Sequence, residues 1–431
     1  MTWRMPAQSL AAVIIVAIAA SASAQTPDVL TLADAEQTAL HNHPQIQAAE
    51  LGALAAKEVV REARATYFPT AFGSLTGADA QSGSRIAAGG LNNPIIYNRL
   101  SGGVTFGQVL TDFGRTRALV TTSSLTAQQQ EVTVTGQRAS ILLDVDRAYF
   151  AALRAQAVER VAQATVDARQ LVFDQVSALA AGSLRSGLDV SFARVNLSTA
   201  QLLLVQARND TQRALASLAA ALGAPSAPVG ALVDEPPPTS PPDDSTPLVA
   251  GALRQRPDLL AARFGAESAA TFADAEASLM RPSVTASGAI GLTPYYQPGI
   301  NDRYAAVGVN VNVPLMNGNL YNARHAEALL RARAQEQRVR DLENQIRRDV
   351  QVAWLNARTA FQRIDLTGQL LEQSSQALDL AQARYTLGLS SIVELNQAQL
   401  NQTQAEVEAA AARYEYQSQA AALAFATGAR K

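Results

Sequence analysis

The chain carries few side chains whose types and spacing could perform chemistry. Its three histidines are His41, His43 and His325, and an H-x-H spacing on a helix places the first two rings on different faces, which disfavours a metal site. The absence of cysteine excludes thiolate metal sites, thiol catalysis and disulfides. There is no glycine-rich phosphate loop, and so few histidines cannot support a Ser/His/Asp set. The sequence therefore predicts a protein that is not an enzyme and holds no cofactor or metal.

The charged residues indicate solvated surfaces rather than a ligand site. Arginines crowd the segment 331–348, but acidic residues are interleaved with them, so a solvated helix face is favoured over an anion site. The formal net charge of −2 gives no electrostatic reason to expect a nucleic-acid partner. The basic residues are Arg331, Arg333, Arg338, Arg340, Arg347 and Arg348, and the acidic ones are Glu336, Asp341, Glu343 and Asp349.

One acidic residue follows a break in a long helical pattern. Gly388, followed by Ser390 and Ser391, is the clearest helix breaker in about 100 residues, and Glu394 comes just after it. Such a break predicts the tip of a helical hairpin. Residues 181–190, which contain Gly182 and Gly187, form a similar break in the first half of the chain, so two hairpins are expected. The carboxylate of Glu394 is either a solvated charge on the first turn of a helix or a functional acid, and both interpretations stay open.

The elements that must position these tips occur twice. Pro44 and Pro69 recur as Pro257 and Pro282, and both pairs of prolines are 213 residues apart, which indicates an internal duplication. Each copy predicts a helix, two short strands, a very long helix, a tip and another long helix. A helix from about 113 to 181 would be about 100 Å long, which no compact domain needs.

The predicted segments have the following boundaries. The first repeat covers 25–223, with an opening helix at about 32–66, strands at about 70–110 and long helices at about 113–223. A proline-rich, extended linker covers 224–247. The second repeat covers 248–431, with an opening helix at about 248–280, strands at about 283–314 and long helices at about 319–428.

After each tip, the helix carries a seam of apolar and small residues spaced alternately three and four apart. Such a heptad seam supercoils left-handedly against a neighbouring helix. Frequent alanine on the seam, and further alanines such as Ala410 and Ala411 beside it, predict contact on two sides, as in a ring of helices. The seam comprises Val190, Ala193, Leu197, Ala200, Leu204, Ala207, Thr211, Ala214, Leu218 and Ala221 in the first copy, and Leu395, Ala398, Gln402, Ala405, Ala409, Ala412, Tyr416, Gln419, Leu423 and Ala426 in the second.

The first 24 residues have the pattern of a cleaved secretory signal. Arg4 precedes an apolar run at residues 10–20, and the segment ends in the small residues Ala22-Ser23-Ala24. The apolar run is too short to span a bilayer. We therefore expect an exported chain whose mature form begins near Gln25.

The predicted strands alternate in polarity, which is typical of a transmembrane barrel. A soluble, half-buried sheet has the same alternation, and the strands alone do not distinguish the two. Four strands cannot close a barrel, and an open sheet edge is not tolerated in hydrocarbon, so a barrel would need several chains. The clearest alternating residues are Val104, Phe106, Val284, Ala286, Gly288, Ile290, Leu292, Val307, Val309, Val311 and Val313, and the loop 294–298 supplies aromatics suited to a membrane interface.

With these features combined, the chain resembles the TolC-like outer membrane efflux protein family over essentially all of residues 30–428. The resemblance rests on the repeated prolines, on Asp112-Phe113-Gly114-Arg115 before the long helix, and on the two tips. It implies a mainly α fold with a β-barrel portion, in which a homotrimer forms a 12-stranded barrel in outer-membrane lipid, continued by an α-helical periplasmic tunnel. It also implies docking to a periplasmic adaptor (membrane fusion) protein and to an inner-membrane pump of RND, ABC or MFS type.

The resemblance also implies roles for individual tip residues. Members of the family narrow the periplasmic entrance with acidic side chains after the second tip, a motif that carries over to Glu394 and Gln397, and Tyr385 matches an aromatic that locks neighbouring helices. Gln397 stands where an acid is familiar and Ser390 where an arginine can occur, so a looser or less cation-selective gate is expected. The predicted adaptor-contacting residues are Gly182, Gly187, Leu188, Leu387, Gly388 and Leu389.

Two functions are consistent with this sequence. One is a passive outer-membrane exit duct for efflux or type I secretion, and the other is a non-conducting periplasmic coiled-coil scaffold. The alternating valines at 304–313 favour the duct. Nothing in the sequence identifies the cargo.

Overall fold

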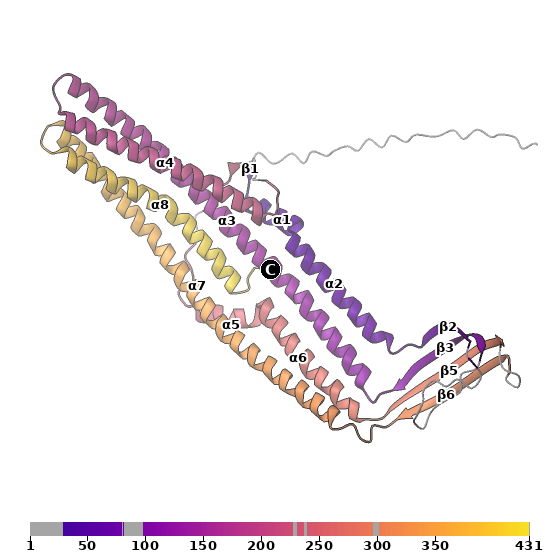
Figure 1. Ribbon diagram of the computed structural model, residues 1–431. Helices are drawn as coiled ribbons and strands as arrows, with labels where there is room; N and C mark the ends of the chain where they lie inside the picture. Colours follow the sequence, from indigo (N-terminus) through magenta and orange to yellow (C-terminus); the bar gives the residue numbers. More distant parts are fainter. Residues whose placement is uncertain are drawn as a thin grey trace, which may run out of the picture.

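The computed structural model describes residues 29–79, 81, 98–226, 231–236, 239–295 and 301–430. The predicted signal segment lies outside the described residues. Residues 296–298 of the predicted aromatic loop also lie outside them. The chain is long and narrow, with a sheet at one end and two helical hairpins at the other (Figure 1).

Eight α-helices occur in the described residues. In the first repeat these are α1 (Leu32–Asn42), α2 (Pro44–Ala65), α3 (Arg115–Ala181) and α4 (Gly187–Ala221). In the second they are α5 (Thr246–Gln255), α6 (Pro257–Ala277), α7 (Leu320–Thr386) and α8 (Ile392–Ala426), with the 3-10 turn η1 (Ser278–Met280) after α6. The two long helices, α3 and α7, each contain 67 residues.

The prediction of one continuous opening helix in each repeat is wrong. The helix breaks at His43 in the first repeat and at Arg256 in the second, and both residues have an extended backbone. The cause is the following proline, which disfavours a helical conformation in the residue before it and is itself well suited to the first position of a new helix. Pro44 and Pro257 therefore begin α2 and α6.

The strands form one four-stranded antiparallel sheet in the order β2-β3-β5-β6. The strands are β2 (Thr70–Ala78), β3 (Arg99–Thr111), β5 (Ser283–Tyr295) and β6 (Arg303–Asn312). The two repeats meet in the middle of the sheet, where β3 pairs with β5. Among the described residues, β2 and β6 are therefore edge strands with one unpaired side each.

The register of the sheet separates an apolar face from a polar face, because opposed residues of neighbouring strands project to the same side. Phe72 and Tyr304 lie on the polar face among small and hydroxylated residues. The apolar face carries Leu75, Val104, Phe106, Val284, Ile290, Leu292, Val307, Val309 and Val311. The polar face carries Thr70, Ser74, Thr76, Ser101, Thr105, Ser283, Thr285, Ser287, Asn310 and Asn312.

The helical seam lies where the sequence predicts it. Every seam position of α4 and α8 is buried or half-buried, and Ala405 is completely buried. Helix α4 packs on α3, whereas α8 packs on both α7 and α3, so α8 makes the predicted contact on two sides. None of the helices within the described ranges has a stretch both apolar and long enough to cross a bilayer.

The predicted linker is not entirely free of regular structure. Its residues Ala231–Leu232 form β4, which pairs in parallel with β1 (Val29–Leu30). The buried hydroxyl of Tyr149 on α3 lies 2.8 Å from the carbonyl oxygens of Leu30 and Val233 and accepts a hydrogen bond from the Val233 N–H at 3.1 Å. Burial raises the pKa of Tyr149 to about 12. This hydroxyl joins both short strands to the middle of a long helix, a contact that no local pattern predicts.

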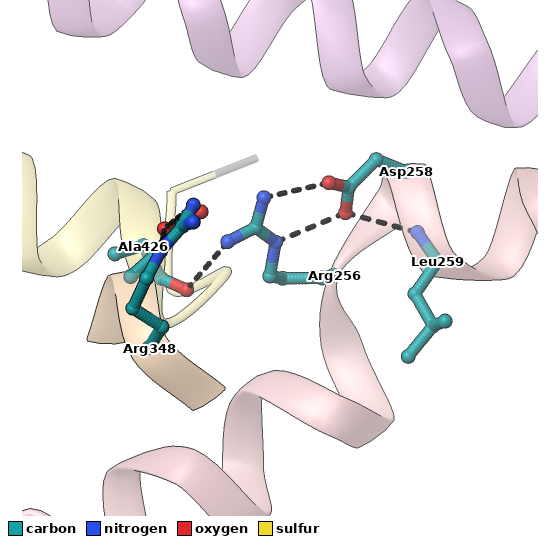
Figure 2. Close-up of polar contacts among 6 residues, drawn as sticks. Arg256, Asp258, Leu259, Arg348 and Ala426 are labelled. Carbon is teal, nitrogen blue, oxygen red and sulfur yellow. Dashed lines mark hydrogen bonds and ion pairs between the residues drawn. The ribbon is translucent and has the colours of Figure 1, made fainter. Parts of the chain in front are cut away.

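In each repeat, a glycine at the end of the last helix contacts the break in the opening helices. Gly223, just after α4, lies against His43, and Gly428, just after α8, lies against Arg256. Both glycines have a positive φ, and a Cβ at either position would come within 3.0–3.2 Å of the backbone of the opposing break. In the second repeat, Arg256 forms a two-pronged ion pair with Asp258 and donates a hydrogen bond to the carbonyl oxygen of Ala426 at the end of α8 (Figure 2).

Candidate functional site at the hairpin tips

The two tips lie close together at the end of the molecule opposite the sheet (Figure 1). Each helix before a tip ends in a turn with one left-handed residue, Ser183 in the first tip and Gly388 in the second. In both turns an N–H reaches back five residues, from Leu184 to Leu179 at 2.9 Å and from Leu389 to Arg384 at 2.8 Å. In the first tip the left-handed residue is thus a serine, and neither Gly182 nor Gly187 has a positive φ.

The helices after the tips begin with related caps. Ser186 accepts a hydrogen bond from the Asp189 N–H, and the Asp189 carboxylate accepts one from the Ser186 N–H, which completes a capping box. Ser391 likewise accepts from the Glu394 N–H at 3.4 Å, but no reciprocal bond to the Glu394 carboxylate forms. The acid of the second tip is therefore not used to cap its own helix.

The carboxylate of Glu394 forms an ion pair across the tip instead. Its oxygen lies 3.3 Å from Nε of Arg384, and 44% of its side chain is exposed, so the charge remains accessible to solvent. Gln397 does not join this pair, because it donates to Asn401 on the next turn of α8 at 2.9 Å. Of the two gate positions at which the family resemblance leads us to expect an acid, only Glu394 carries a charge.

Tyr385 is buried in the second tip, with only 6% of it exposed. The guanidinium of Arg185, from the other tip, lies 4.1 Å from the centre of the Tyr385 ring and donates a hydrogen bond to the Tyr385 carbonyl oxygen at 2.8 Å. Burial raises the pKa of the Tyr385 phenol. The hydroxyls of Tyr385 and Ser390 are both buried without a hydrogen-bond partner among the described residues.

The outer surface of both tips is apolar. Leu188 and Leu389, which were predicted to contact an adaptor, are exposed, and so is Leu184 beside them. Leu387 is the most exposed leucine of the predicted set, at 74%. Gly182, Gly187 and Gly388 are exposed as well. An apolar, solvent-facing surface of this kind is typical of a protein contact site.

Three polar contacts at and beside the tips were not predicted from the sequence. These are the Arg185 contact to Tyr385, the Arg384–Glu394 pair, and a hydrogen bond of 2.5 Å between Asn196 on α4 and Asn396 on α8. Arg185 stands out as the one arginine among the small and apolar residues of its tip, which was an available signal. No group of three or more His, Cys, Asp or Glu side chains that could hold a metal occurs in the described part of the chain.

Comparison with known proteins gives a consistent result. Residues 35–224 and 248–429 match the model of a family described as outer membrane efflux protein. The outer membrane protein TolC of Escherichia coli (strain K12) is 24% identical over 399 residues, which cover 89% of this chain and 79% of TolC. Two solved outer-membrane proteins share the fold. They are VceC of Vibrio cholerae (TM-score 0.77, 22% identity, covering 92% of this chain and 96% of VceC) and OprN (TM-score 0.80, 20% identity, covering 92% and 89%).

Proposed function

The chain belongs to the outer membrane efflux protein family, and from this premise we propose that three copies form one exit channel that docks to a periplasmic adaptor and an inner-membrane pump. It is an outer-membrane efflux channel protein with a large periplasmic helical portion. The trimer, the closed barrel and the docking are the proposal.

The observation that carries the proposal is the open sheet. In the described residues of one chain this sheet has four strands, and β2 and β6 each present an unpaired edge. An unpaired edge costs several kcal/mol for each unsatisfied backbone group in hydrocarbon, so the edges must pair with other copies. Pairing β6 of one copy with β2 of the next, three times over, closes a barrel of twelve strands, which is wide enough for a lumen.

The two faces of the sheet support the same assembly. The face with Val104, Ile290 and Val307 suits lipid, and the face with Thr105, Thr285 and Asn310 suits a water-filled lumen. The helices then continue the lumen away from the membrane, and the hairpin tips form the periplasmic end. There the exposed leucines offer an apolar surface to an adaptor, and Glu394 would form a ring of three carboxylates around the entrance.

The test is the mass and conductance of the purified protein in detergent. Light scattering corrected for bound detergent should give three chains per particle, and the particle should form conducting channels in planar bilayers. A detergent-independent, non-conducting particle would contradict the channel and support the alternative of a periplasmic coiled-coil scaffold. Co-purification with an adaptor would then test the docking separately.

A further inference from the structure

On the sheet side of the tips, α3, α4 and α8 line a cavity of about 610 Å³ that is partly open to solvent. The cavity begins next to the Asn196–Asn396 hydrogen bond, where α4 and α8 come together, and α3 contributes Arg169 to its wall. A volume of this size is typical of sites for small organic molecules. Its lining is mixed, with apolar side chains such as Leu203, Leu400 and Val407 beside amides, hydroxyls and the carboxylate of Glu408.

Arg169 is the unusual residue of this cavity. Only 8% of it is exposed, and its Nη2 donates to the Gln399 carbonyl oxygen at 2.9 Å and to the Thr403 hydroxyl at 3.1 Å. Both acceptors are neutral, and among the described residues no carboxylate lies within ion-pair distance of its guanidinium. Burial lowers the pKa of Arg169, opposed by the nearby Glu406. A buried cation without a contacting anion is costly, so an anion entering this cavity would be stabilised.

A second group in the same wall also lacks a partner. Gln399 is only 3% exposed, and its side-chain oxygen Oε1 has no hydrogen-bond donor among the described residues. The wall of the cavity therefore has two unmet polar groups. The positive charge of Arg169 faces only neutral acceptors, and the side-chain oxygen of Gln399 lacks a hydrogen-bond donor among the described residues. A ligand with an anionic group, a hydroxyl or N–H donor and an apolar ring would match all three properties of the cavity.

We propose that the cavity between α3, α4 and α8 binds a small amphiphilic organic anion, whose carboxylate pairs with Arg169 and whose apolar part lies against Leu203, Leu400 and Val407. Because both α4 and α8 line the cavity, the bound anion connects the two hairpins just above their tips. This site goes beyond the proposed exit channel, and its occupancy is measured by binding rather than by export.

The probe is hydroxynaphthoate, compared with hydroxynaphthamide, its neutral amide. Calorimetric titration of the intact protein in a nonionic amphipol should show saturable binding of the carboxylate and at least tenfold weaker binding of the amide, a difference of about 1.4 kcal/mol. Arg169→Gln should weaken carboxylate binding to the level of the amide. Arg208→Gln removes an exposed arginine of α4 outside the cavity lining and should bind like the parent.

A second variant tests whether Arg169→Gln loses binding only because its helices pack less tightly. Leu400→Trp fills the cavity from a half-exposed position and leaves Arg169 in place, so it should also abolish binding. Equal binding of carboxylate and amide, unchanged binding by either cavity variant, or no binding by the parent would each overturn the proposal. The last result is expected if an acidic side chain of a neighbouring copy already pairs with Arg169, and the conductance of the channel would be unaffected by it.

Discussion

The Arg185 guanidinium lies over the Tyr385 ring, 4.1 Å from its centre, and so joins the two hairpin tips of one chain. The second tip has Ser390 where related tips can have an arginine, and Arg185 from the first tip supplies a cation to the same region. The contact combines a stacked cation with a hydrogen bond to a backbone carbonyl, and the cation–π part alone is worth about 0.5–2 kcal/mol.

Removing this cation should loosen the tips. We expect Arg185→Gln to raise single-channel conductance in planar bilayers, because the first tip no longer holds the second. Tyr385→Phe is the matched control: it keeps the ring under Arg185 and removes a hydroxyl that has no partner within the described residues. Higher conductance in Tyr385→Phe would instead show that this hydroxyl bonds to a neighbouring copy.

The Glu394 carboxylate should set the ion selectivity of the entrance. In a threefold assembly three copies of Glu394 repel one another and attract cations. We expect a cation-selective channel that divalent cations block from the periplasmic side, and we expect Glu394→Gln to lose both properties. Glu394→Asp should retain them. An unchanged reversal potential and divalent block in Glu394→Gln would mean that this residue is only a solvated surface charge.

Arg384 provides a test of opposite sign. It lies 3.3 Å from the Glu394 carboxylate and therefore neutralises part of the proposed ring. Arg384→Gln should increase the cation selectivity measured from reversal potentials, whereas Glu394→Gln should decrease it. If the two substitutions change selectivity in the same direction, the ion pair does not lie at the conducting path.

How far the sequence predicts the fold depends on the range of each interaction. The seam through Ala405 and the alternation through Val307 follow from periodicity, so the helices and the strands could be placed within a few residues. The breaks at His43 and Arg256 could also have been predicted, since each precedes a proline. The contact of Arg185 with Tyr385 could not, because it joins residues 200 positions apart that only the packing of two hairpins brings together.

Overpacking the seam should destabilise the assembly. Ala405 is completely buried where α8 packs on its neighbours, and Ala412 is 4% exposed. Replacing either by Leu should cost about 1–3 kcal/mol per site and lower the temperature at which the proposed trimer dissociates on a gel. Ala216→Leu, at an exposed position of α4, should have no such effect. Unchanged trimer stability in both seam variants would show that the seam is not closely packed.

Substitutions at Gly388 should affect export through the backbone conformation of the turn and through the size of the new side chain. Its φ of +73° is left-handed, and nothing lies within 4 Å of an added Cβ, so a substitution strains the backbone without a clash inside the chain. We expect Gly388→Trp to abolish export while the trimer and its membrane insertion remain intact, because the tip can no longer approach an adaptor. Gly388→Asn tolerates the conformation and should export normally. Export at the parent level by Gly388→Trp would count strongly against the tip as the docking site.

The last prediction concerns a buried acid far from the tips. Asp146 on α3 is completely buried, and Nη2 of Arg430 lies 2.6 Å from its carboxylate while Nη1 of the same arginine lies 2.5 Å from Glu36 on α1. Two carboxyl groups thus share one guanidinium. Burial outweighs the attraction of Arg430 and raises the pKa of Asp146 to about 8, with Glu36 adding to the rise.

A raised pKa fixes the sign of the pH dependence. The folded chain holds a proton on Asp146 that the unfolded chain releases near its ordinary pKa, so this contribution to stability is full at acid pH and is lost as the pH rises towards about 8. The free energy of unfolding falls by at most about 1.4 kcal/mol per pH unit for each copy.

We expect the midpoint of thermal unfolding, followed by circular dichroism, to fall between pH 5 and pH 8 in the parent. Asp146→Asn resembles the protonated acid, so it should be as stable as the parent at pH 5 and should lose less stability as the pH rises. Asp144→Asn, at an exposed position of α3, is the control and should behave like the parent. If Asp146 were instead ionised and paired with Arg430, its replacement by Asn would leave a buried cation unpaired and cost about 3–5 kcal/mol at neutral pH. Asp146 would then make no contribution to a fall of the parent's unfolding midpoint between pH 5 and pH 8, because it would be ionised in both the folded and the unfolded chain.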